Sequence, residues 1–197
     1  MKTQFKLLAG LVLGAAASMA NADAIPYPNV GTPAPANTFH AASTGNISAY
    51  FFGSSASYVS RIGLKVNGVD TGIYGLTNNV SHYGNSISFG NVNSGDTLEF
   101  VLQVLSINNS WYSVPVHNTD KKNHTYATSF SGGSDIHGHS IVPGTYIAFE
   151  DLFNLGDLDY NDHQFVFTNV AVPEPAGLVL LGLGLVALGA ARRRAAK

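Results

Sequence analysis

A two-residue alternation of apolar and polar side chains runs through the middle of this chain and limits it to β structure. From residue 60 to 66 apolar residues take every second position, with Arg61 and Lys65 between them. The pair Asn67-Gly68 follows, which favours a two-residue hairpin turn, and residues 69–74 return from it. No stretch of the central chain has the sustained 3.6-residue apolar repeat of a helix. We therefore expect antiparallel β-sheet.

Further short runs of β-branched and aromatic residues predict the other strands. They cover residues 47–52, 86–89, 97–106, 111–116, 126–130, 146–149 and 164–170. Many short strands with closely spaced turns are typical of a β-sandwich or jelly roll. We place this domain at residues 39–171, which is long enough to bury a core although the chain has no cysteine. The polar segment 117–124 is expected to be an exposed loop.

The N-terminal end has the pattern of an export signal. Residues 1–22 contain Lys2 and Lys6, then an apolar run, then the small-residue site Ala20-Asn21-Ala22. These three parts in this order predict a secretory signal peptide. Residues 23–38 are rich in proline and small polar residues, which predicts an extended linker.

The C-terminal end has the pattern of a short membrane helix. An apolar run at residues 176–191 is followed by Arg192, Arg193 and Arg194. Sixteen helical residues would extend about 24 Å, which is marginal against a hydrocarbon core of about 30 Å. The basic end should remain in the cytoplasm, with the domain outside.

Pro173, Glu174 and Pro175 stand directly before this run. The order Pro-Glu-Pro, apolar helix and arginine cluster over residues 172–197 resembles a PEP-CTERM sorting signal, a family found in exopolysaccharide-producing Gram-negative bacteria. The resemblance implies that the protein is a substrate of an exosortase-type enzyme. It also implies transient anchoring in the inner membrane, followed by delivery to the cell surface or extracellular matrix.

The charge distribution excludes one class of partner. Residues 23–175 contain all twelve acidic residues and only four basic ones, a net charge of −8. Nucleic-acid binding requires a positively charged surface, so we do not expect it.

Five of the twelve acidic residues fall within residues 149–167, and no lysine or arginine lies nearby in sequence. Crowded carboxylates repel one another, and a bound Ca²⁺ ion would relieve the repulsion through hard oxygen ligands. The spacing Asp157-x-Asp159-x-Asn161 resembles the start of an EF-hand, but Asp162 and Thr168 occupy the positions where an EF-hand needs glycine and glutamate. We therefore predict a calcium loop at the edge of the sandwich. Its candidate ligands are Glu150, Asp151, Asp157, Asp159, Asn161 and Asp162.

The same stretch resembles a domain of secreted bacterial proteins for which calcium binding has been suspected. The residues that match are Phe149-Glu150-Asp151, then Gly156-Asp157-x-Asp159-Tyr160-Asn161-Asp162, then an aromatic strand. Phe153, Asn154 and Leu155 depart from the pattern, because a run of glycine is usual there, and so does Leu158, where arginine or another polar residue is frequent. The alternative interpretation of the acids is that they accept backbone N–H bonds in turns without any ion.

Three further hypotheses remain open. Asp135, His137 and His139 could bind a transition metal, or could belong to a solvated loop. Trp111 and Tyr112, with Tyr58 and Tyr83, could form a sugar platform in a carbohydrate-binding module of the exopolysaccharide matrix. A glycosidase using paired acids such as Glu150 and Asp159 ranks lower, because such crowded acids do not separate an acid from a base, and we expect no enzymatic activity.

Overall fold

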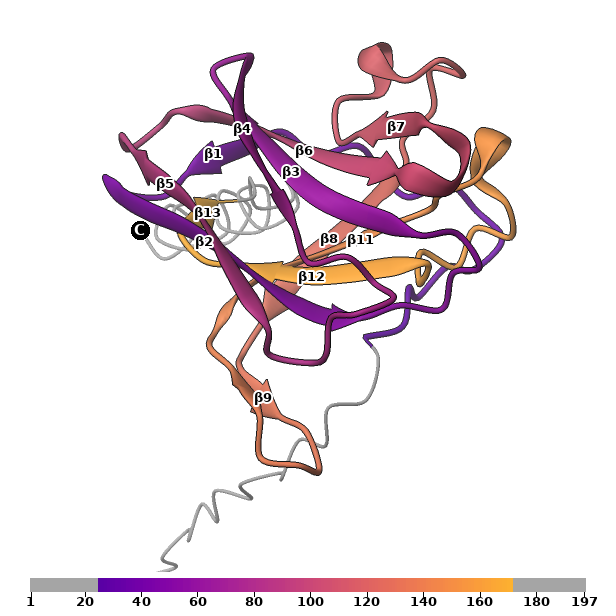
Figure 1. The fold of residues 1–197 in the computed structure, drawn as a ribbon. Coiled ribbons are helices and arrows are strands. Elements are labelled where there is room, and N and C mark those ends of the chain that lie inside the picture. The colour runs from indigo at the N-terminus through magenta and orange to yellow at the C-terminus, as the bar shows by residue number, and fades with distance from the viewer. Residues whose placement is uncertain (1–24, 172–197) are drawn as a thin grey trace, which may run out of the picture.

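A computed structural model describes residues 25–171 of the chain. The predicted signal peptide (1–22) and the predicted sorting tail (172–197), with its apolar helix, lie outside the described residues. The described part is all-β, with two antiparallel sheets packed face to face as a sandwich (Figure 1). Its helical elements are three short 3₁₀ turns, so none of its helices is long and apolar enough to span a membrane.

One sheet has the strand order β13-β1-β6-β3-β4, with β7 also paired to β6. Its strands are β1 (Phe39–Ala41), β3 (Ser60–Val66), β4 (Val69–Gly75), β6 (Thr97–Val104), β7 (Asn109–Tyr112) and β13 (Val170–Ala171). The other sheet has the order β5-β2-β12-β11-β8. Its strands are β2 (Gly45–Gly53), β5 (Ser86–Val92), β8 (Thr125–Phe130), β11 (Gly144–Phe149) and β12 (His163–Phe167). A small hairpin pairs β9 (Gly133–Ser134) with β10 (Ser140–Ile141).

The predicted hairpin at residues 60–74 is confirmed as β3 and β4. Asn67 and Gly68 have φ angles of 51° and 81°, as both central residues of this type of turn require. Three predicted strands are shorter than expected. The strand predicted at residues 164–170 ends at Phe167 as β12, and Val170 begins β13 in the other sheet. β6 ends at Val104 and is followed by the 3₁₀ turn η1 (Leu105–Ile107). β7 ends at Tyr112, and η2 (Pro115–His117) follows, since proline cannot donate a ladder hydrogen bond.

The main core lies between the two sheets. It is formed by alternate residues of facing strands, including Ile62 and Leu64 from β3 and Phe165 and Phe167 from β12, all fully buried. Phe100 of β6 packs on Phe167 with 4.3 Å between ring centroids. The alternation in the sequence thus places one side of each strand in this core.

A second core covers the outer face of the five-stranded sheet. Tyr146, Ala148 and Val166 point outward from the strands and are buried there. The segment 25–38 covers them, with Tyr27 4% and Ala34 5% exposed. From residue 25 onward the predicted linker is therefore packed onto the sandwich, although it has no regular secondary structure.

The polar segment 117–124 differs from the expected exposed loop. Asn118 and His124 are completely buried. The Asn118 side chain accepts a bond from the backbone N–H of Tyr112 and donates to the carbonyl oxygens of Tyr112 and Lys122. In this irregular segment the Asn118 side chain satisfies backbone groups that no neighbouring strand pairs with. Polar groups can be buried because they are hydrogen-bonded in this way.

Candidate metal site in the acidic loop

The acidic loop connects two neighbouring strands, β11 and β12. Phe149 and His163 are directly paired at the ends of these strands, so both ends of the loop 150–162 start from the same edge of the sheet. The loop must fold back on itself, and η3 (Phe153–Leu155) makes part of the reversal. This topology brings Glu150 close to Asp157 and Asp159, which follow it in the sequence.

Several residues of the loop have a left-handed backbone. Asn154, Leu155, Leu158 and Tyr160 have φ angles of 66°, 76°, 63° and 51°. Left-handed conformations cost roughly 1–2 kcal/mol for a residue with a Cβ. Asn154 and Leu155 occupy positions where the similar domain usually has glycine. Their positive φ angles show that the backbone has the left-handed conformation that glycine adopts most easily. Gly156, with φ 58°, lies close to the Glu150 side chain, and a Cβ added at this glycine would come 3.2 Å from Glu150 Oε2.

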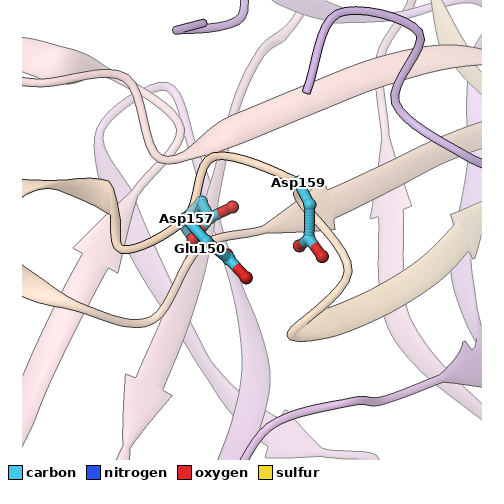
Figure 2. A group of neighbouring side chains, drawn as sticks. All are labelled: Glu150, Asp157 and Asp159. Atoms are coloured by element: carbon cyan, nitrogen blue, oxygen red, sulfur yellow. The ribbon is translucent and has the colours of Figure 1, made fainter. Parts of the chain in front are cut away.

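Three carboxylates converge inside the loop. One oxygen each from Glu150, Asp157 and Asp159 lies within 4.8 Å of the others (Figure 2). Asp157 is exposed and Asp159 is half-buried, whereas Glu150 is completely buried. The site is thus open on the side of the aspartates and closed on the side of the glutamate.

Glu150 is the most unusual residue of the group. Its Oε1 accepts a 2.6 Å bond from the backbone N–H of Tyr160, but its buried Oε2 has no hydrogen-bond partner within residues 25–171. Burial raises the pKa of Glu150 to about 8, and the charges of Asp162, Asp157 and Asp159 add to this effect. Burial and the Asp157 charge also raise the pKa of Asp159. The ion-free loop is therefore electrostatically unfavourable for its own ionised carboxylates.

The chemistry of this donor set fits a hard divalent cation. Carboxylate oxygens are the ligands that Ca²⁺ prefers, and Ca²⁺ sites also use backbone carbonyl and water oxygens. An uncompensated buried carboxylate oxygen is costly, and a cation would satisfy it. The residues present therefore fit a calcium ion, with Glu150, Asp157 and Asp159 as the side chains that would hold it.

The other three predicted ligands lie differently. Asn161 donates its side-chain amide to Asp159, and its backbone N–H also bonds Asp159 at 3.1 Å. Asp162 Oδ2 accepts a 2.9 Å bond from the backbone N–H of Asp151, and burial raises the pKa of Asp162. Asp151 faces inward and bonds His163 Nε2 at 3.0 Å. These three residues hold the loop through hydrogen bonds, and they do not belong to the group of three converging carboxylates.

A buried polar network beneath the loop was not predicted from the sequence. His124 Nδ1 bonds the carbonyl oxygen of Glu150 at 2.9 Å, and His124 Nε2 bonds the Asp120 carboxylate at 3.0 Å. The Trp111 ring stacks on His124 at 3.8 Å and donates its indole N–H to the carbonyl oxygen of Asp151. These partners come from β7 and from the loop before β8, so no local spacing in the sequence pointed to them.

The burial of Trp111 removes this residue from the predicted sugar platform. Trp111 is 1% exposed, so its ring cannot stack on a sugar, whereas Tyr112 is half-buried on the outer face. Lys65 Nζ lies 4.5 Å from the centre of the Tyr112 ring. Tyr74 pairs with Gly63, Gly63 with Val101, and Val101 with Tyr112. Tyr74 and Tyr112 therefore lie in one row across four strands of this sheet.

The fold and the loop define an all-β, two-sheet module with an acidic site at one edge. A comparison with protein families adds the C-terminal part: residues 171–194 match the PEP-CTERM protein-sorting motif. This match agrees with the signal predicted at residues 172–197 and supports an exported protein that exosortase sorts. No curated protein and no solved structure matches the chain.

Proposed function

We propose that this chain is a non-catalytic exported protein whose β-sandwich is stabilised by Ca²⁺ in the acidic loop. The PEP-CTERM tail delivers it to the cell surface or the exopolysaccharide matrix, after transient anchoring in the inner membrane and processing by an exosortase-type enzyme. The sandwich is the delivered part, and the ion stabilises the loop that joins β11 and β12 at one end of the five-stranded sheet.

The observation that carries the calcium proposal is the unpartnered Oε2 of Glu150. Glu150 is 0% exposed, and its free oxygen belongs to the carboxylate that Asp157 and Asp159 face. In the alternative interpretation, backbone N–H groups satisfy the acids. That interpretation fits Asp162, but it leaves one oxygen of Glu150 unsatisfied.

The non-catalytic proposal rests on access. A glycosidase needs its acid and its base to reach the bond between two sugars. Glu150 has the raised pKa of a general acid, but it is completely buried. A cavity of about 240 Å³ lies elsewhere, between β1 and the segment after β7, where Phe39, Leu98 and Pro115 are among its lining residues. A reducing-end assay on the host polysaccharide should therefore show no activity.

The calcium proposal is tested by unfolding the domain, residues 23–172, in urea with Ca²⁺ and with a chelator. At a free Ca²⁺ concentration 100 times the Kd, the unfolding free energy should rise by about 2.7 kcal/mol. Glu150→Gln should remove this gain while keeping the bond from the Tyr160 N–H. An unchanged midpoint in the native protein would end the proposal.

A carbohydrate-binding role is the second candidate, because Tyr112 and Tyr74 lie in one cross-strand row on the outer face of the six-stranded sheet. Aromatic rings on a flat sheet face are suited to stacking on sugar rings. Retention of the protein on host exopolysaccharide, lost in Tyr112→Ala, would support this role. The C-terminal mass of the protein recovered from its host tests the sorting step separately.

A further inference from the structure

The hairpin between β8 and β11 projects from the body of the sandwich (Figure 1). Its strands β9 and β10 are joined by residues 135–139, Asp-Ile-His-Gly-His. Ser134 and Ser140 bond to each other across the hairpin at 2.8 Å, directly below this turn. His137 and His139 are both exposed. Two imidazoles are thus presented on a short, closed turn.

Asp135 uses both carboxylate oxygens to fix this turn. Oδ1 accepts the backbone N–H groups of His137 and His139, at 3.0 and 2.8 Å, and Oδ2 lies 2.8 Å from Nδ1 of His139. The Asp135 backbone closes the turn through bonds with His139 and Gly138. Both carboxylate oxygens of Asp135 are therefore used to hold the turn. We assign Asp135 an orienting role instead of the role of a third metal ligand.

The bond to Asp135 determines the tautomer of His139. The Asp135 carboxylate can only accept a hydrogen bond, so Nδ1 carries the proton and the neutral ring has its lone pair on Nε2. Metal-binding histidines commonly donate their other ring N–H to a carboxylate in this way. The His139 side chain is 57% exposed, which makes it accessible to an ion from solvent.

His137 supplies a second imidazole two positions earlier. Its ring centroid lies 6.3 Å from that of His139, with an angle of 53° between the planes. Two imidazoles bound to one Zn²⁺ place their nitrogens about 3.3 Å apart, with each nitrogen about 2.0 Å from the ion. Binding one ion would therefore require the exposed His137 side chain to turn toward Nε2 of His139, which Asp135 holds in place.

We propose that His137 and His139 form a binding site for a borderline transition-metal ion of the Zn²⁺ or Cu²⁺ type, with Asp135 as the positioning residue. Imidazole nitrogens select such ions, whereas the oxygen ligands of the acidic loop select Ca²⁺. The remaining coordination positions stay open to water or to an external ligand. The hairpin site depends on none of the residues of the calcium proposal.

The test is a Zn²⁺ titration of the full-length chain in mild detergent, with saturating Ca²⁺ present to occupy the acidic loop. His137→Ala and His139→Ala should each weaken Zn²⁺ binding at least tenfold. His82→Ala, in the neighbouring turn, should leave it unchanged. Equal affinity in the native protein and both hairpin variants would overturn the proposal, as would equal weakening in His82→Ala.

The positioning role of Asp135 has its own measurement. Nitrogen-15 NMR of labelled histidine should show Nδ1–H of His139 in the metal-free protein and a shift of its Nε2 signal on adding Zn²⁺. Asp135→Ala should populate the other tautomer and weaken Zn²⁺ binding, while circular dichroism shows an unchanged fold. An unchanged tautomer in Asp135→Ala would remove Asp135 from the proposal.

Discussion

The acidic loop and the β9–β10 hairpin each hold a carboxylate between two strands, but the two carboxylates are in opposite situations. Glu150 is buried with one unpartnered oxygen, and burial raises its pKa to about 8. Asp135 is also partly shielded from water, but bonds from His139 and His137 outweigh this effect and lower its pKa. A buried carboxylate with one unpartnered oxygen favours a bound cation, whereas a fully bonded carboxylate instead orients a neighbouring side chain.

The largest effect that we expect from the buried Glu150 carboxylate is a pH dependence of Ca²⁺ binding. With no ion bound, Glu150 is protonated below about pH 8, and Ca²⁺ must displace this proton. Affinity should rise by up to about tenfold per pH unit between about pH 5 and pH 8. Calorimetric titrations at four pH values would measure it. A pH-independent Kd would contradict the assignment of Glu150 as a ligand.

The ion-free protein should respond to pH in the opposite direction. The folded pKa of Glu150 is above its usual value, so the stability gained from the protonated form is complete below about pH 4.5. That gain is lost as pH rises through about 8. Urea unfolding in chelator should therefore show falling stability from about pH 5 to pH 8, and Glu150→Gln should reduce this slope.

The next largest effect is expected from Asp159→Asn. Removing one of the three converging charges should weaken Ca²⁺ binding by about tenfold to a hundredfold. Asp96→Asn, in the turn between β5 and β6, removes the same charge outside the group of converging carboxylates. Its Ca²⁺ affinity should equal that of the native protein. Equal weakening by both variants would mean that net charge, rather than a defined site, attracts the ion.

A smaller effect is expected from Tyr160→Phe, which tests whether the acidic loop also holds the N-terminal segment. Tyr160 Oη accepts the backbone N–H of Ala34 at 2.9 Å and donates to the carbonyl oxygen of Asn123 at 3.0 Å. Losing both bonds in a buried site should cost about 1–3 kcal/mol of unfolding free energy. Hydrogen exchange at the Ala34 amide should accelerate.

Tyr126→Phe is the matched control for this experiment. The Tyr126 ring packs on Tyr27, 4.9 Å between centroids, and within residues 25–171 its hydroxyl makes no hydrogen bond. Removing that hydroxyl should leave stability and exchange unchanged. If both variants behave alike, the contact between loop and segment depends on ring packing alone.

The smallest effect is expected from Asp135→Asn. All the bonds of Asp135 lie inside one exposed turn, so the unfolding midpoint should stay at the native value. If Asp135→Asn lowered the unfolding midpoint as far as Tyr160→Phe does, the hairpin would contribute to the stability of the core. The acidic loop and the hairpin would then not differ in the way described above.

The sequence alone determined the class of fold and the location of the acidic site. Period-two alternation and the pair Asn67-Gly68 identified the hairpin β3–β4, because side-chain direction and turn backbone are local properties. The crowding of acids between residues 150 and 162 likewise needed no structure to be noticed. The tail motif was equally local, and the family comparison agrees with it.

Tertiary structure decided which side chains meet. Strand pairing between Phe149 and His163 closed the loop and brought together the carboxylates of Glu150, Asp157 and Asp159. In the same loop, Asp151 bonds His163 instead. Tertiary structure also buried Trp111 and packed the proline-rich segment onto the second core. These outcomes depend on contacts between residues far apart in the chain, and burial and pKa follow from such contacts rather than from local spacing.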